Sequence, residues 1–287
     1  MRLWSVILSL LLIAGTLAAC DTSPGDVSFA PAPNPAWSLL TADSIPNTAD
    51  WKTAGLKSVG LGETEIRNSA TCSLGTVYVL STPTYSIFGD VYLAVETENT
   101  VWLTAICDSA DAVSFVLCDV DGTSGEEIVL NLETDGTGGA GVYDSTVWKI
   151  TPSGVFRMFA SGWDQRFDTG FEARPQAPFQ LVIQNRYTGY EVVVDVQDHP
   201  DYCFTEFEED GTPKKAQSPL YMDTFYGFTP EDVDKDGIME LVCTQYTSYA
   251  FHADGAGDAV STLKYDPATH TITVIDARFE PYRDRHL

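Results

Sequence analysis

Three aspartates and a glutamate fall at odd-numbered positions of one short stretch, Asp232 to Glu240. Their side-chain oxygens lie at its first, third, fifth and ninth positions, and Gly237 at the sixth permits a sharp turn. Calcium takes oxygen ligands at flexible geometry, and alternate carboxylates on a curled loop supply them. We therefore predict a calcium site with donors from the side chains of Asp232, Asp234, Asp236 and Glu240 and from the carbonyl of Ile238.

The residues after this loop distinguish it from an EF-hand. An EF-hand has a bidentate glutamate at the twelfth position and a helix beyond it, whereas Cys243 stands there and a β pattern follows Glu240. We expect the loop to close a β-hairpin. The alternative is a solvated acidic turn without metal, but three aspartates within five residues would repel one another without a cation.

A related stretch lies about 113 residues earlier in the chain. It offers oxygens from the side chains of Asp119, Asp121, Thr123 and Glu127 and from the carbonyl of Gly125. Thr123 replaces the third aspartate, and fewer charges predict weaker calcium binding than in the later loop. The alternative is a hairpin that retains only the shape of a calcium loop.

Both stretches continue in the same way. A glycine-rich loop follows, then a strand with Trp148-Lys149 in one copy and Leu263-Lys264 in the other, then a turn and a last strand. Each copy is a four-stranded meander, which is the unit of a β-propeller blade. We place the two units near residues 112–161 and 223–279.

The later loop resembles the calcium loops of FG-GAP and VCBS repeats, which read D-x-D/N-x-D-G-x-x-D/E before an apolar strand. The resemblance implies the same ligands as the spacing does. The approach Phe225-Tyr-Gly-Phe-Thr-Pro resembles the opening of an FG-GAP repeat, although the closing Gly-Ala-Pro is absent.

The earlier loop also resembles motif one of haloacid-dehalogenase phosphatases, an apolar strand that ends in D-x-D-G-T. By that resemblance Asp119 would be the nucleophile and Asp121 the acid or base. The family's chemistry requires a doubly wound α/β domain, whereas another strand begins within four residues of Thr123. We therefore expect no phosphatase.

The rest of the sequence predicts an all-β fold. Short runs rich in β-branched and aromatic residues alternate with turn residues, and no window has a sustained helical stripe. Without crossover helices the sheets should be antiparallel, as a degenerate or incomplete propeller or as a β-sandwich. The twelve predicted strands are 76–81, 90–96, 100–107, 114–120, 127–133, 145–151, 155–160, 179–184, 190–196, 240–246, 261–265 and 271–276.

The N-terminus has the features of a lipoprotein signal peptide. Residues 1–19 combine a basic start with a short apolar run, and Leu17-Ala-Ala-Cys20 resembles a lipobox. The resemblance implies cleavage before Cys20 and lipid on its thiol, which would anchor the chain to a membrane. Residues 20–36 have the composition of a flexible tether, and we expect the all-β domain to occupy 37–287.

The charge and the cysteines restrict the partners. A formal net charge of −25 disfavours nucleic acid. Five cysteines follow Cys20 without a zinc spacing, so at least one is expected to be a free thiol. We expect a calcium-stabilised binding module on the extracytoplasmic face of a membrane, with a protein or glycan ligand outside the cell. The alternatives are an envelope or glycan hydrolase and a structural envelope-assembly lipoprotein; no catalytic residues can be chosen.

Overall fold

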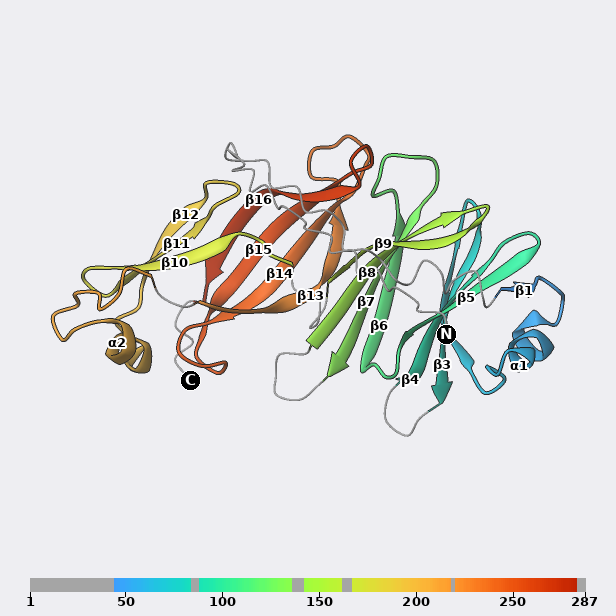
Figure 1. Ribbon diagram of the computed structural model, residues 1–287, viewed down its shortest axis with the longest axis horizontal. Coiled ribbons are helices and arrows are strands. Elements are labelled where there is room, and N and C mark those ends of the chain that lie inside the picture. The colour runs from blue at the N-terminus through green and yellow to red at the C-terminus, as the bar shows by residue number, and fades with distance from the viewer. Residues whose placement is uncertain (1–43, 84–87, 136–141, 162–166, 218–219, 283–287) are drawn as a thin grey trace, which may run out of the picture.

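The computed structural model describes residues 44–83, 88–135, 142–161, 167–217 and 220–282. Strands dominate these residues and form four antiparallel sheets (Figure 1). The predicted all-β fold class and the antiparallel pairing are confirmed. The signal peptide, Cys20 and the tether lie outside the described residues.

Two of the sheets come from the first half of the described chain. Sheet I has the order β1-β5-β4-β3-β2, formed by Ile45–Pro46, Thr100–Cys107, Phe88–Glu96, Gly75–Pro83 and Glu65–Cys72. Sheet II has the order β6-β7-β8-β9, formed by Ala112–Cys118, Glu127–Asp135, Val142–Thr151 and Gly154–Ser161.

The other two sheets come from the second half. Sheet III has the order β10-β11-β12, formed by Phe171–Gln176, Gln180–Asn185 and Glu191–Asp195. Sheet IV has the order β13-β14-β15-β16, formed by Tyr221–Glu231, Glu240–Ser248, Gly255–Asp266 and Thr271–Pro281. Sheets II and IV are the four-stranded meanders that contain the two acidic stretches.

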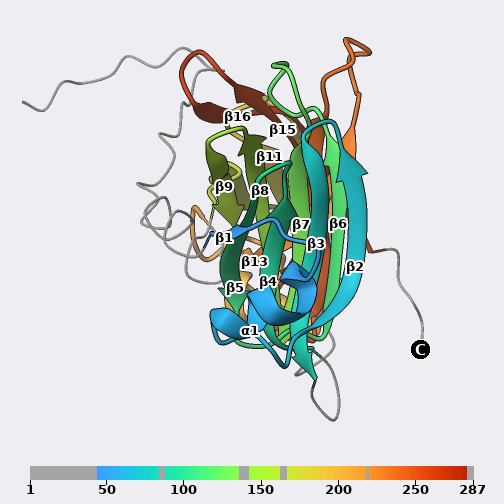
Figure 2. The ribbon, with the colours of Figure 1, turned by 90° about the vertical axis from the view of Figure 1, so that its right-hand side faces the viewer.

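The sheets stand in a row that does not follow the order of the chain. Figure 1 shows sheet I beside sheet II, sheet II beside sheet IV, and sheet III at the far end beside sheet IV; Figure 2 shows the row from the side of sheet I. Each neighbouring pair shares one apolar cluster. These clusters join Leu93 of sheet I with Leu130 of sheet II, Val129 of sheet II with Phe228 of sheet IV, and Leu181 of sheet III with Phe279 of sheet IV.

Sheet II is buried on both faces because successive side chains of a strand point to opposite sides. Ile128, Leu130 and Trp148 belong to the cluster shared with sheet I. Val129 and Val147, one position out of step with them, belong to the cluster shared with sheet IV. The alternation places one four-stranded unit between two other sheets, as in consecutive propeller blades, although the described sheets form a row.

In the described residues, helix is confined to short segments. A π-helical turn at Trp51–Gly55 (η2) runs into α1 (Leu56–Ser58) and buries Trp51 against sheet I, while α2 (Pro200–Glu206) follows sheet III. Within the described ranges, none of these helices is long or apolar enough to cross a membrane.

All twelve predicted strands are present, and four further strands have no predicted counterpart. Strand β2 has mostly exposed side chains and β1 has only two residues, so neither has an apolar pattern. Strand β10 contains Pro175, which an edge strand tolerates. Strand β13 has two register shifts against β14 that interrupt its alternation.

Candidate metal centres

The two acidic loops occupy equivalent places in the fold. Residues 119–126 connect β6 to β7 in sheet II, and residues 232–239 connect β13 to β14 in sheet IV. We call them loop one and loop two. At each loop three carboxylates converge, with ligand atoms within 4.8 Å of one another, and could hold a metal ion. They belong to Asp119, Asp121 and Glu127 at loop one, and to Asp232, Asp234 and Glu240 at loop two.

The glutamate that follows each loop is enclosed by the protein. Glu127 is 1% exposed and Glu240 is 0% exposed, and each is the first residue of the second strand of its sheet. One oxygen of Glu127 accepts a hydrogen bond from the Val120 amide at 2.8 Å, and one of Glu240 accepts from the Val233 amide at 3.0 Å. These bonds fix both carboxylates, and the second oxygen of each lies toward a lysine.

In loop two that lysine is Lys264, from the third strand of sheet IV. Its ammonium lies 2.7 Å from both Asp234 Oδ2 and Glu240 Oε1 and 3.3 Å from Asp236 Oδ2. The contact follows from the sheet register, in which Lys264 stands on β15 beside the start of β14. The carboxylates of loop two therefore contact a cation that belongs to the protein itself.

Loop one repeats this arrangement with Lys149 of β8. Its ammonium contacts Asp121 Oδ2 and Thr123 Oγ1 and lies 3.5 Å from Glu127 Oε1. Lys149 stands directly opposite Glu127 in the β7–β8 register. Thr123 also donates its hydroxyl hydrogen to Asp121 at 2.6 Å, and its amide donates to the same carboxylate at 2.9 Å.

Asp232 has a carboxylate oxygen that the protein leaves unsatisfied. Its Oδ2 accepts a hydrogen bond from the Gly237 amide at 3.2 Å, whereas its Oδ1 is buried and has no hydrogen-bond partner among the described residues. A buried carboxylate oxygen without a partner is unfavourable, and a bound cation would satisfy it. Within the described chain, loop one has no buried carboxylate oxygen that lacks a hydrogen-bond partner.

Burial and the lysines alter the pKa values of the loop carboxyl groups. Burial raises the pKa of Glu127 to about 6, against the opposing effects of the Val120 amide and Lys149. Burial also acts to raise the pKa of Asp121, but hydrogen bonds from Lys149 and Thr123 outweigh it and lower that pKa. In loop two the Lys264 hydrogen bond lowers the pKa of Asp234.

The two loops touch each other at the junction of sheets II and IV. The Met239 amide donates a hydrogen bond of 2.7 Å to the Asp119 carbonyl oxygen. Gly122 lies so close to the Ile238 side chain that an added Cβ would come within 2.6 Å of Ile238 Cδ1. The two anionic loops are therefore parts of one surface.

The structure gathers most of the predicted ligands at these two places. Asp236 and Thr123 stand outside the two groups of converging carboxylates but contact the lysines. Gly237 has the positive φ of 90° that the predicted tight turn requires. The carbonyl oxygens of Ile238 and Gly125 stay predictions.

The two lysines are the part of the site that the ligand prediction does not contain. Lys149 and Lys264 occupy equivalent positions of the internal repeat, so the sequence indicates that the two residues are related. Only the strand register shows that each lysine lies beside the glutamate after its loop.

The phosphatase alternative does not fit the surroundings of Asp119 and Asp121. The strand after loop one, β7, pairs antiparallel with β6, so the motif lies on a hairpin and not at the carboxyl edge of a parallel sheet. The Asp121 carboxylate is already engaged by Lys149 and Thr123.

The five cysteines of the described chain do not add a metal site. The groups of possible metal ligands in the described chain contain none of them. All five are free thiols, and each packs in or against one of the apolar clusters: Cys72, Cys107, Cys118, Cys203 and Cys243.

These features define an all-β protein with a pair of acidic loops, each contacted by a lysine from the third strand of its sheet. Residues 171–278 match a family model described as the YybI C-terminal domain. The match covers sheet III, α2 and nearly all of sheet IV, and it includes loop two but not loop one. No curated protein and no solved structure matches the chain.

Proposed function

We propose that this protein is an extracytoplasmic lipoprotein, anchored to a membrane through Cys20, whose acidic loops bind calcium and stiffen a β-sheet binding module. The observation that supports calcium most strongly is the convergence of carboxylates at both loops, with one buried oxygen of Asp232 left without a partner. All the donors are oxygen atoms, which suits a hard cation.

The charge balance leaves room for a divalent ion beside or in place of each lysine. Loop one brings three carboxylates near one ammonium, and loop two brings four carboxylates, including Asp236, near one ammonium. Loop two gathers four carboxylates against three in loop one, and Asp232 also keeps its unsatisfied oxygen. Loop two is therefore the stronger calcium site of the pair.

Calcium would act by ordering the hairpins. Extracellular calcium modules bind with a Kd of roughly 0.1–1 mM. At ~1 mM calcium and a Kd of ~0.1 mM, one site stabilises the folded state by about 1.4 kcal/mol. Because the lysines already compensate part of the charge, the protein folds without the metal.

Thermal unfolding in calcium and in EGTA tests this proposal. Calcium should raise the Tm of the mature chain, and replacing Asp232 and Asp236 with alanine should abolish the rise. Asp119→Ala should reduce it less. Asp276→Ala, which removes an exposed carboxylate from β16 of the same sheet, is the control and should leave the rise intact. A Tm that is identical in calcium and EGTA would contradict calcium binding.

The lipid anchor has a separate test. Mass spectrometry of the protein from its native membrane should find an N-terminal peptide that starts at Cys20 and carries acyl chains. Cys20→Ala should release the protein from the membrane fraction. Recovery of an unmodified Cys20 in a membrane-free fraction would contradict the anchor without bearing on calcium.

A further inference from the structure

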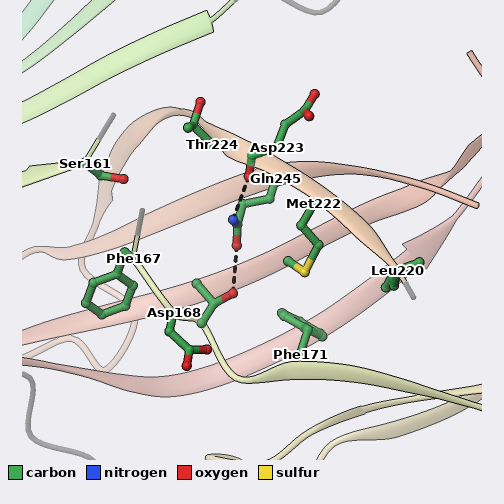
Figure 3. Close-up of a pocket in the computed structure, with 10 residues that line it drawn as sticks. Ser161, Phe167, Asp168, Phe171, Leu220, Met222, Asp223, Thr224 and Gln245 are labelled. Atoms are coloured by element: carbon green, nitrogen blue, oxygen red, sulfur yellow. Dashed lines mark hydrogen bonds between the residues drawn. The ribbon is translucent and has the colours of Figure 1, made fainter. Parts of the chain in front are cut away.

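A cavity of about 250 Å³ lies where sheets II, III and IV meet, apart from both acidic loops (Figure 3). It is lined by Ser161 at the end of β9, Phe171 at the start of β10, Met222 on β13 and Gln245 on β14, among others. Its volume is slightly below the roughly 300–1,000 Å³ of pockets for drug-sized ligands, so it suits a smaller molecule.

One wall of the cavity carries a fixed amide. Gln245 is 6% exposed, and its side-chain oxygen accepts a hydrogen bond of 2.7 Å from the Thr169 hydroxyl. Its amide nitrogen donates to the Asp223 carbonyl oxygen at 2.9 Å. Figure 3 shows both bonds, which hold the amide in one orientation. The amide keeps one further N–H and one further lone pair for a ligand, and it loses little freedom when the ligand binds.

Two hydroxyl groups of the lining belong to nearly buried residues. Ser161 is 3% exposed and Thr224 is 6% exposed, and neither hydroxyl forms a hydrogen bond with the described part of the chain. Neither oxygen is among the fully buried side-chain atoms that lack a partner in the described chain, so both are accessible from the space that they line. Both hydroxyls are therefore available to a molecule inside the cavity.

The rest of the described lining is apolar or acidic. Phe167, Phe171 and Met222 supply an aromatic and thioether surface, to which the C–H groups of a ligand are attracted. Two aspartates are the charged members of the described lining. Asp168 pairs with Arg186, and Asp223 lies 2.8 Å from His252 Nε2.

We propose that this cavity binds one neutral sugar unit. A pyranose presents an apolar C–H face, which packs on Phe171, and a rim of hydroxyl groups, which pair with Ser161, Thr224 and the Gln245 amide. An anionic sugar is disfavoured by the two aspartates. The inference rests on the binding role proposed above and names its ligand class, but it does not require a cation in either acidic loop.

Saturation-transfer NMR and calorimetry on the mature chain test the proposal with defined probes. The neutral probes are glucose, galactose, mannose and N-acetylglucosamine; glucuronate and glucosamine carry a negative and a positive charge. At least one neutral sugar should bind with a Kd in the millimolar range, as expected for so small a ligand. Glucuronate should bind more weakly than glucose. Binding of glucosamine alone would overturn the proposal, because it would show a site for an amine.

Near-isosteric variants connect binding to the cavity. Ser161→Ala and Thr224→Val each remove one hydroxyl with little change in volume and should weaken binding of the neutral sugar by roughly 2- to 10-fold, the range for one hydrogen bond. Ser261→Ala, which removes a buried, unpartnered hydroxyl outside the lining, should bind as wild type. Unchanged affinity in both cavity variants, or no binding by any neutral sugar, would overturn the proposal.

The acidic loops provide a check that separates the two proposals. The variant without Asp232 and Asp236 should still bind the sugar in EGTA. Sugar binding without a calcium effect on Tm would support the sugar site in the cavity and contradict calcium binding by the loops. A calcium effect on Tm without sugar binding would support calcium binding by the loops and contradict the sugar site.

Discussion

Replacing Lys149 with methionine removes the ammonium group from loop one and keeps most of the side-chain volume. Lys149 then no longer compensates Asp121, which is 5% exposed, or Glu127, which is 1% exposed. Breaking a buried ion pair by removing one partner typically costs about 3–5 kcal/mol, because a charge remains buried without compensation. Asp121 and Glu127 each keep a backbone amide donor, so we expect the low end, about 3 kcal/mol.

Calcium should restore much of this loss. The vacated ammonium position lies near the oxygens of Asp119, Asp121 and Glu127, and a divalent ion can occupy it without competition from the lysine. In EGTA the variant should therefore unfold roughly 6–12 °C below wild type, given about 2–4 °C per kcal/mol for a chain of this size. In saturating calcium the difference should become smaller.

Urea unfolding followed by tryptophan fluorescence measures the loss of stability in EGTA and its recovery in calcium. Lys57→Met, at an exposed position of α1, is the matched control and should change the free energy of unfolding by less than about 0.5 kcal/mol. A Lys149→Met chain as stable as wild type in EGTA would refute the role of this lysine. A large loss that calcium leaves unchanged would show a purely structural ion pair.

Two further predictions concern the junction of sheets II and IV and the thiols. The Asn131 amide donates to the Phe228 carbonyl oxygen at 3.0 Å and accepts from the Phe228 amide at 2.8 Å, so Asn131→Ala should lower the free energy of unfolding by about 1–3 kcal/mol in a urea titration. Asn99→Ala, in the exposed turn after β4, should change it by less than about 0.5 kcal/mol, and equal losses in the two variants would contradict this role of Asn131. Burial raises the pKa of Cys107 from its ordinary value of 9.0 to about 11, so at pH 8 its iodoacetamide reaction rate should be about 100-fold below that of an exposed thiol. Cys243 is fully buried and should react only after unfolding; peptide mass spectrometry that finds either cysteine labelled in the native protein at the rate of an exposed thiol would refute the burial.

The acidic loops could be predicted from the sequence because their chemistry is local. Asp232, Asp234 and Glu240 are close in the chain, and glycine at the sixth position indicates the turn that gathers them. The internal repeat also aligns Lys149 with Lys264. Only the pairing of the strands, however, shows that each lysine compensates the carboxylates of its loop.

The packing of the sheets could not be predicted in the same way. Sheet II shares its second apolar cluster mainly with sheet IV, although sheet III follows sheet II in the chain. Contacts such as Asn131 with Phe228 join residues about 100 positions apart. The cavity depends on the same packing. Ser161, Phe171 and Gln245 line one space only because three sheets converge there, and no spacing in the sequence indicates this.

Calorimetry on the mature chain, after calcium has been removed with a chelator, tests calcium binding by the loops most directly. We predict saturable binding with a Kd of roughly 0.1–1 mM, up to two ions per chain, and loss of the stronger site when Asp232 and Asp236 are replaced by alanine. The absence of binding heat and of any thermal shift at millimolar calcium would contradict this prediction, and would leave Lys149 and Lys264 as permanent counter-ions of the two loops.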